Sequence, residues 1–301
     1  MKTILITGAT GLVGRALVKA LLSKGYVVHY LTTRKEVIVN QENYKGFYWN
    51  INSGFIDVNC FKEADMLIHL AGATVSKRWT KKYRKEIFKS RVAGSNLLFS
   101  SLQKSPHTID SFISASGISI FPNSLEKVYS EELQEKSQSF LGRVVDKWEK
   151  AAHQFLELGV KTTIVRTGVV LSKQNSALQK IAKPIQMGIG AALGSGKQFM
   201  SWIHIEDLVQ MYVFLIEKEL TGTYNAVAPN PVTNKELTKL VAQQLGKKIL
   251  LPNVPVFMLK LLLGQMHEIV LESQRVSSEK IKKSGYQFRY PDINMVLKDL
   301  L

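Results

Sequence analysis

The sequence holds only one cysteine, Cys60, among 301 residues. A lone thiol cannot form an internal disulfide, and without a cysteine cluster we predict no metal site. Long hydrophobic runs are also missing. The longest, residues 256–264, is interrupted by Lys260 and is too short to cross a bilayer. A strand-like run begins two residues after Met1, so we expect no cleavable signal peptide, a cytoplasmic location and no membrane partner.

Acidic residues are scarce, with 24 Asp and Glu against 40 Lys and Arg and a formal net charge of +16. A solvated basic surface explains this, and so does a polyanionic partner such as nucleic acid, a membrane or a phosphorylated ligand. The densest basic stretch, SKRWTKKYRKEIFKSR (residues 76–91), carries Trp79 and Tyr83, as single-stranded nucleic-acid binding would require. No RNP-type, zinc-finger or helix-turn-helix pattern accompanies it. The expected partner is therefore a small-molecule substrate; an oligomer is compatible with the sequence.

Apolar runs alternate with helical periodicities through the first two thirds of the chain. The runs predict strands at residues 3–7, 26–31, 46–50, 66–71, 111–116 and 162–171, and the periodicities predict helices at 12–23, 83–103 and 142–158. The strands are almost continuously apolar, as burial on both faces of a parallel sheet requires. This alternation predicts an α/β fold with a Rossmann-type doubly wound parallel sheet.

The pattern divides the chain into three parts. Residues 1–172 read as the nucleotide-binding domain, and residues 173–228 as a substrate-side segment with returning Rossmann elements. Residues 229–301 contain short helical stretches separated by prolines and glycines, which predicts a smaller, mostly helical C-terminal domain. The glycine-rich segment 187–199 is not a phosphate-binding P-loop, because Ala191 and Gln198 occupy positions where that motif needs glycine and Ser or Thr.

The motif TGATGLVG (residues 7–14) lies at the first strand–helix junction. Gly8 permits a sharp turn, Gly11 lets a pyrophosphate approach the backbone, and Gly14 lets the helix pack closely on the sheet. The N–H groups at the helix start then face the phosphates. A glycine-rich turn without a ligand is the alternative, but a second strand follows on schedule. We therefore predict dinucleotide binding by Gly8, Thr10, Gly11, Leu12, Val13 and Gly14.

The second strand ends at Thr33 and Arg34, where NAD-binding proteins carry an acid that accepts hydrogen bonds from the ribose 2′-OH. A hydroxyl and a planar cation suit the 2′-phosphate of NADP instead, and Lys35 adds positive potential. An arginine that only ends the strand in solvent is the alternative. We predict NADP(H) as the cofactor.

The chain resembles the extended, sugar-nucleotide epimerase-like branch of the short-chain dehydrogenase/reductase superfamily. Within that branch it is similar to the epimerase family proteins that carry a C-terminal domain of unknown function. The motifs that carry the resemblance are TGATGLVG (7–14), LTTR (31–34), HLAG (69–72), KSRVAGS (89–95), FISASG (112–117), KWEKAA (147–152), VRTGVVL (165–171), GSGKQFMSWIHIEDLV (194–209) and GYQFRYPDI (285–293). Of these, the block at 194–209 is far more specific than the glycine motif.

The resemblance implies further cofactor contacts. It places Leu70 and Ala71 beside the adenine, Glu86 and Arg91 on the following helix with Arg91 toward cofactor phosphate or ribose, and Val170 near the nicotinamide. His69 and the pair His204 and Asp207 are expected to be structural, as are Trp148 and Glu149, which would anchor their helix.

Related reductases and epimerases use a Tyr-x-x-x-Lys pair, in which the lysine lowers the tyrosine pKa for proton exchange, and a serine that orients the substrate. Ser116, or less favourably Ser114, supplies the serine. The tyrosine position falls at Phe140 or Leu141 and the lysine position at Val145, and none of these side chains can exchange a proton.

Other nearby groups do not clearly replace the missing pair. Tyr129 reads as a surface tyrosine beside two glutamates, and Asp146 and Lys147 could act only in a shifted helix register. We therefore expect an NADP(H)-dependent oxidoreductase or epimerase acting on a small polar, possibly nucleotide-sugar-like, substrate. A catalytically silent NADPH-binding regulator or scaffold stays open as the alternative.

Overall fold

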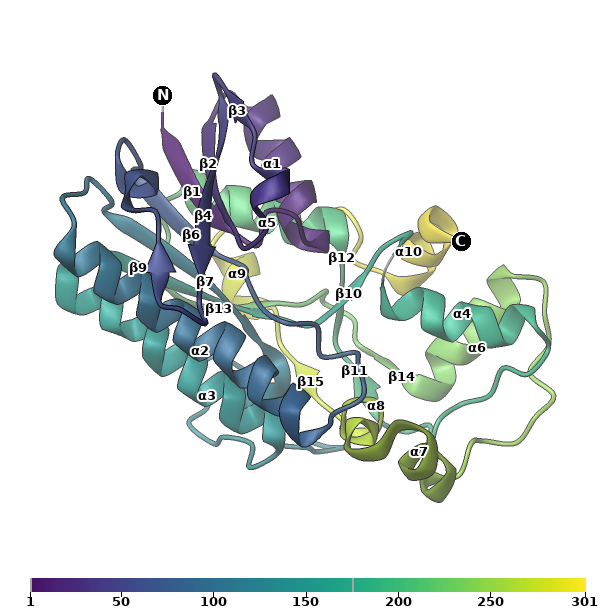
Figure 1. The fold of residues 1–301 in the computed structure, drawn as a ribbon. Helices are drawn as coiled ribbons and strands as arrows, with labels where there is room; N and C mark the ends of the chain where they lie inside the picture. The colour runs from purple at the N-terminus through teal and green to yellow at the C-terminus, as the bar shows by residue number, and fades with distance from the viewer. Residues whose placement is uncertain (1, 175) are drawn as a thin grey trace.

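The structure is a computed structural model that describes residues 2–174 and 176–301. Its centre is a parallel sheet, shown in Figure 1. The parallel strands are β1 (Thr3–Thr7), β2 (Val27–Thr32), β4 (Tyr44–Asn50), β6 (Met66–His69), β7 (Ser111–Gly117), β9 (Lys161–Thr167) and β13 (Gly222–Ala226). They lie in the order β13-β9-β7-β6-β1-β2-β4, so the chain reverses direction across the sheet between β1 and β6. This is the doubly wound arrangement, in which ligands bind beyond the carboxyl ends of the strands at that reversal, the region called the crevice below.

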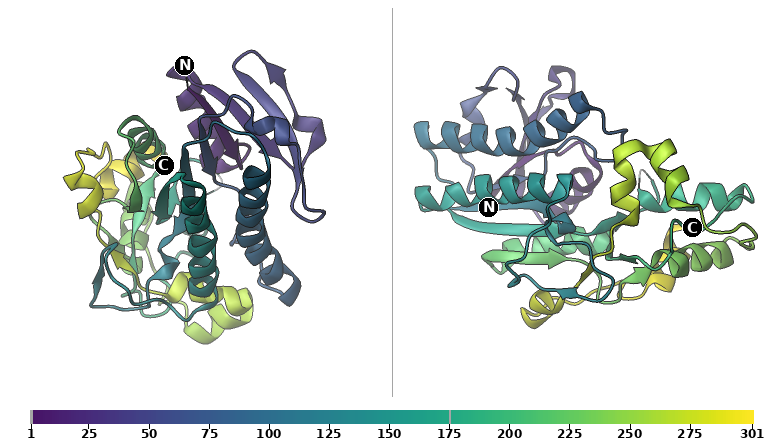
Figure 2. Two further views of the ribbon diagram at one scale, coloured as in Figure 1. Left: turned by 90° about the vertical axis from the view of Figure 1, so that its left-hand side faces the viewer. Right: turned by 90° about the horizontal axis from the view of Figure 1, so that it is seen from below.

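Helices cover both faces of the sheet. On one face α1 (Leu12–Ser23) packs against α5 (Ile205–Glu217), and on the other α2 (Lys81–Lys104) lies along α3 (Phe140–His153). The two layers are seen on either side of the sheet in Figure 2. The predicted α/β, Rossmann-type doubly wound fold is confirmed.

The C-terminal part is mostly helical, also as predicted. In its core α4 (Ala177–Gln186) packs with α6 (Asn234–Gln244) and α10 (Ile293–Leu300). Three further helices follow α6 in the chain and precede α10: α7 (Val256–Leu263), α8 (His267–Leu271) and α9 (Glu279–Lys283). The remaining short strands are β3 (Asn40–Gln41), β5 (Phe55–Ile56), β8 (Val128–Tyr129), β10 (Val169–Leu171), β11 (Phe199–Met200), β12 (Trp202–His204), β14 (Val232–Thr233) and β15 (Arg275–Val276).

Asp207, at the start of α5, ties the C-terminal tail to the sheet domain. Its buried carboxylate accepts hydrogen bonds from the backbone N–H groups of Arg289 and Tyr290, at 2.8 and 2.9 Å, and from the Tyr286 hydroxyl at 3.2 Å. Because a buried carboxylate is tolerated when several donors satisfy it, this network is structural, as expected.

Two predicted strands differ from the structure. The fourth ends at His69 instead of residue 71, so Leu70 and Ala71 form the loop after β6. The sixth is divided at Gly168, where a Cβ atom would lie 2.5 Å from the Ser201 carbonyl oxygen. After this close approach the chain leaves the main sheet, and β10 pairs with β12. Only β9 belongs to the central sheet.

Among the described residues, every helix is too short or too polar to cross a lipid bilayer.

Candidate functional site

The turn after β1 and the loop after β6 meet at the reversal point of the sheet. Gly8 has φ +74°, and a Cβ there would lie 2.8 Å from the Ala71 backbone nitrogen. A Cβ at Gly14 would lie 2.1 Å from the Gly8 carbonyl oxygen, and Gly11 donates its N–H to that same oxygen at 2.9 Å. The turn can close in this form only because these positions lack side chains.

The first turn of α1 leaves its N–H groups available. Gly11 is the N-cap residue and provides no capping side chain, and the residues that follow it, including Leu12 and Val13, are neutral. The described residues of that turn therefore offer no carboxylate to the positive end of the helix dipole. An anion placed beside Thr10 and Gly11 would meet free donors, which is how helix starts bind phosphate.

Thr33 and Arg34 follow β2 and are both exposed. The backbone N–H of Arg34 donates to Thr32 Oγ1 at 3.2 Å, which shapes the turn, while the guanidinium has no partner among residues 2–174 and 176–301. Lys35 Nζ lies 4.8 Å from the centre of the Tyr48 ring. Arg34 is thus an unpaired cation at the carboxyl end of β2.

The Thr7 hydroxyl holds the loop after β6 in place. It lies 2.6 Å from His69 Nδ1 and accepts the Ala71 N–H at 3.1 Å. His69 is fully buried, and burial lowers its pKa to about 4, with the nearby Arg91 charge acting in the same direction. A neutral imidazole buried in this way supports the expected structural role, and the Thr7 hydroxyl that it contacts holds Ala71 in place.

Arg91 reaches this loop from α2. Its Nη1 donates to the Ala73 carbonyl at 3.0 Å, and its guanidinium lies 5.3 Å from the centre of the Trp148 ring. Burial lowers the Arg91 pKa to about 10, so the group stays cationic at neutral pH. Glu86, by contrast, is exposed on α2, and Val170 lies in β10 opposite Ile203.

Ser116 lies in a buried polar cluster. Its hydroxyl donates to Glu149 Oε1 at 2.6 Å, and Arg166 holds the same carboxylate with Nε and Nη2, each at 2.8 Å. All three side chains are more than nine-tenths buried. Ser116 and Arg166 are paired neighbours on β7 and β9, and Glu149 reaches them from α3. Glu149 anchors its helix, as expected, and the only hydroxyl proton of Ser116 is already donated.

The positions of the missing Tyr-x-x-x-Lys pair are apolar in space as well as in sequence. Leu141 packs in a cluster around Trp79 and Ile87, and Val145 in one around Phe121. A Cβ at Gly117 would lie 3.8 Å from Val145 Cγ2. Groups able to exchange a proton are therefore replaced here by hydrocarbon.

The prediction that Tyr129 is a surface residue was wrong. Its side chain is 1% exposed and stacks on Phe121 with ring centres 5.1 Å apart. Tyr129 lies in β8, which pairs with β15, an association between distant segments that neighbouring glutamates could not reveal. Burial raises its pKa, so it is no proton donor near neutral pH.

Asp146 is ion-paired with Lys136 and Lys150, at 2.6 and 2.9 Å. These ion pairs outweigh the effect of partial burial and lower the pKa of Asp146.

Glu268, in the first turn of α8, and Glu272, which follows α8, form a carboxyl pair near the start of α3. Glu268 Oε2 is buried and has no hydrogen-bond partner within the described part of the chain. Burial, with the charge of Glu268 adding to it, raises the pKa of Glu272 to about 7, and the Ser139 side chain partly opposes the shift. Since Ser139 is the N-cap of α3, this pair borders the position of the absent tyrosine.

Sequence reasoning missed Arg166 and the Glu268–Glu272 pair. The signal for Arg166 was present, because a charged residue inside the apolar run TTIVRTGVVL needs a buried partner. Nothing in the sequence links α8 to the start of α3, because that contact depends on how the C-terminal part folds back.

The fold and the crevice define a doubly wound α/β protein of the Rossmann type. The family described as "NAD dependent epimerase/dehydratase family" matches residues 4–226, and "Domain of unknown function (DUF1731)" matches residues 254–300. The chain therefore belongs to the NAD dependent epimerase/dehydratase family. This confirms the resemblance to the epimerase-like branch, including its C-terminal domain.

The similar proteins and solved structures are consistent with this family. An epimerase family protein of Staphylococcus aureus (strain MRSA252), SAR0825, is 37% identical over 308 residues, covering 100% of this chain and 99% of that protein. The crystal structure of the human epimerase family protein SDR39U1 with NADPH is similar at TM-score 0.84 and 27% identity, covering 99% of this chain and 98% of that one. A nucleoside-diphosphate sugar epimerase from Corynebacterium glutamicum is similar at TM-score 0.79 and 28% identity, covering 99% of this chain and 58% of that one.

Proposed function

We propose that the protein binds NADP(H) and acts as an oxidoreductase or epimerase on a small polar substrate. The observation that carries this proposal is the crevice between β1 and β6, where unsatisfied helix-start N–H groups lie beside glycines that cannot carry a side chain. The residues present fit the cofactor: the turn at Gly8 and Gly11 would hold the diphosphate, and Arg34 would pair with a 2′-phosphate. The structure of human SDR39U1 with NADPH supports the same ligand class.

The wider cofactor assignment follows from position. Thr33 would flank the 2′-phosphate, Leu70 and Ala71 would border the adenine side, and Arg91 would face a phosphate or the ribose. Val170 would lie toward the nicotinamide, beyond the end of β9. Exposed Glu86 is the least supported member of the set, because its side chain lies on the outer surface of α2.

A bound nicotinamide supplies hydride transfer, and the protein must then exchange a proton with the substrate. Ser116 could accept a hydrogen bond from a substrate hydroxyl, but its own proton goes to Glu149. Glu272 offers a carboxyl whose pKa of about 7 suits proton exchange near neutrality. The apolar side chains at Leu141 and Val145 favour the second candidate, an NADPH-binding regulator without turnover.

The test of the cofactor is the substitution Arg34→Asp. Losing a phosphate-pairing cation typically costs about 1–3 kcal/mol, so NADPH affinity should fall roughly ten- to a hundred-fold while NADH affinity changes little. Calorimetric titration with both coenzymes measures this, and Lys19→Asp on the exposed side of α1 is the control. Equal weakening of both coenzymes would show that Arg34 does not read the 2′-phosphate.

Turnover is tested separately, by following NADPH oxidation across a panel of carbonyl compounds and nucleotide sugars. Stereospecific hydride transfer to any of them excludes the regulator. Tight NADPH binding without activity on any compound of the panel would favour the regulator.

A further inference from the structure

One side of the molecule joins the basic segment at the start of α2 to the exposed helix α7. In the view from below in Figure 2, α2, α3 and α7 all lie on the side toward the viewer. Arg84 Nη1 donates to Gln265 Oε1 at 2.7 Å, which connects α2 to the residues that follow α7. We call this side, formed by α2, the start of α3 and α7, the basic–apolar face.

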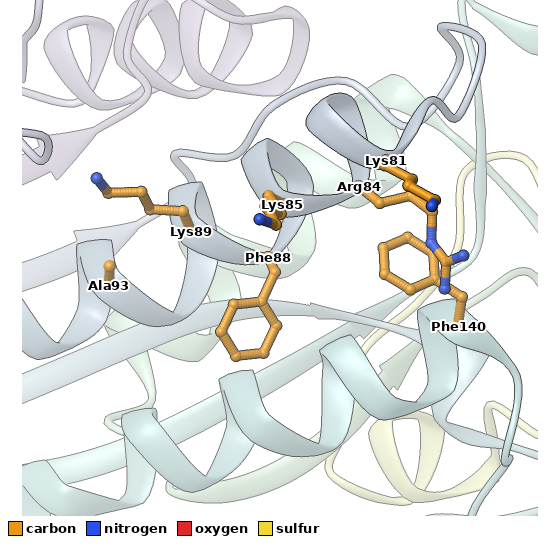
Figure 3. A pocket seen from close by; sticks show the side chains of 7 residues that line it. All are labelled: Lys81, Arg84, Lys85, Phe88, Lys89, Ala93 and Phe140. Carbon is orange, nitrogen blue, oxygen red and sulfur yellow. The ribbon is translucent and has the colours of Figure 1, made fainter.

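Cations dominate the α2 part of the face. A shallow groove of about 620 Å³ between α2 and the start of α3, shown in Figure 3, is lined by Lys81, Arg84, Lys85, Phe88, Lys89, Ala93 and Phe140. Arg84 Cζ lies 4.2 Å from the centre of the Phe140 ring. The lining combines these cations with the rings of Phe88 and Phe140 and includes no acidic side chain.

The α7 part of the face is apolar and exposed. Phe257, Leu261 and Leu262 are 70%, 77% and 66% exposed, whereas Leu259 on the opposite side of the helix is buried and anchors it. Apolar side chains gathered in this way mark a contact surface.

The chemistry of the whole face selects the partner. A second copy packed symmetrically would bring the same cations together, in a chain that already carries a net charge of +16. A nucleic acid would match the cations and leave α7 in water. An anionic bilayer matches both parts, since lipid phosphates attract lysines and the headgroup–acyl boundary accepts apolar side chains.

We propose that the basic–apolar face docks the protein on an anionic phospholipid membrane, with α7 in the headgroup–acyl boundary and the cations of α2 against lipid phosphates. The expectation of no membrane partner rested on the missing transmembrane segment, and peripheral docking needs none. The cations of the basic stretch 76–91 other than Arg91, which cofactor binding leaves unexplained, then have a role. The proposed cofactor site uses Arg91 of α2 but none of the groove residues and no residue of α7, so this proposal does not depend on the function proposed above.

The test is co-sedimentation of the full-length protein with large unilamellar vesicles. Vesicles of phosphatidylcholine with about one-third phosphatidylglycerol should bind the protein, and pure phosphatidylcholine vesicles should bind it at least about ten-fold more weakly, because surface cations contribute only on the anionic membrane. Raising the salt concentration should weaken binding, since screening acts on those cations.

Two pairs of variants separate the two parts of the face. Lys85→Glu with Lys89→Glu, and Phe257→Ser with Leu261→Ser, should each lower vesicle partitioning by about ten-fold or more. The matched controls are Lys19→Glu with Lys298→Glu for charge, and Phe55→Ser with Met295→Ser for exposed apolar area. Both controls should bind like the unmodified protein. NADPH affinity should be unchanged in all four variants, which shows that each is folded.

Three results would overturn the proposal. In the first, the protein binds both vesicle types equally, or it binds neither. Another is retention on a single-stranded oligonucleotide without retention on vesicles, which would assign the cations to nucleic acid. The third is a dimer in sedimentation velocity that Phe257→Ser with Leu261→Ser abolishes while vesicles bind nothing, which would assign α7 to a second copy.

Discussion

The two sides of the crevice differ in which polar groups are already satisfied. On the β1–β2 side, no side chain caps the start of α1, and the guanidinium of Arg34 has no partner within residues 2–174 and 176–301. On the β7–β9 side, Ser116 donates to Glu149 and Arg166 holds the same carboxylate. Free donors in an open crevice indicate a ligand, whereas a buried and satisfied network indicates structure. This difference explains why the proposed cofactor site is better supported than the proposed proton-transfer step.

The largest expected effect tests whether the β7–β9 side is structural. Arg166→Leu leaves Glu149 as a buried, unpaired carboxylate and should lower the free energy of unfolding by about 3–5 kcal/mol. The double variant Arg166→Leu with Glu149→Leu should recover most of that loss, because no charge is then buried alone. Urea unfolding measures both. A single variant as stable as the unmodified protein would contradict the structural reading.

The next effect tests the β1–β2 side. Gly14→Ala places a methyl group against the Gly8 carbonyl, so the turn must open, at a cost of about 2–3 kcal/mol in stability and with loss of NADPH binding. Gly25→Ala is the control, because a Cβ there meets open space and costs only about 1 kcal/mol for its positive φ. Thermal unfolding and NADPH titration separate the two. Retained NADPH binding in Gly14→Ala would mean that the turn does not hold the cofactor.

A smaller effect concerns pH. The pKa of Glu272 is raised from 4.5 to about 7 in the folded protein, so the folded state holds that proton more tightly than the unfolded chain. Its contribution to stability is full below about pH 4.5 and is lost as the pH rises through about 7. Glu272→Gln, which resembles the protonated form, should therefore be more stable than the unmodified protein at pH 8, by on the order of 1–2 kcal/mol after solvent screening.

At pH 4 that difference should vanish, and Glu132→Gln in an exposed loop should show none at either pH. A constant difference across the range would mean that Glu272 is not protonated near neutrality. Loss of hydride transfer in a stable Glu272→Gln protein would identify the proton-exchange group.

The smallest effect separates the two roles open to Ser116. Ser116→Ala removes one of the hydrogen bonds to Glu149 and should cost about 1 kcal/mol, while Arg166 keeps the carboxylate paired. Ser114→Ala, two residues earlier in β7, is the matched control. If turnover is found, a large fall in kcat for Ser116→Ala alone would place its oxygen on the substrate. Unchanged turnover would leave it a structural residue.

Features that depend on residues close together in the sequence were predictable. The glycine turn, the strand ends beside it and Arg34 all belong to one strand–helix–strand unit, so spacing fixes their relation. The absence of the Tyr-x-x-x-Lys pair was likewise visible, because both residues would lie on one helix. Strand 162–171 was predicted as one element because Gly168 gives no local sign of the backbone it approaches.

The sequence alone determined the doubly wound sheet and the glycine turn after β1, because hydrophobic period and glycine position act within a few residues of each other. The tertiary structure decided the rest: that Ser116 gives its proton to Glu149, that Tyr129 is buried, and that Glu272 lies beside α3. It also brought α7 beside the basic start of α2. Each of these depends on which distant surfaces meet when apolar area is buried, and no local pattern encodes that choice.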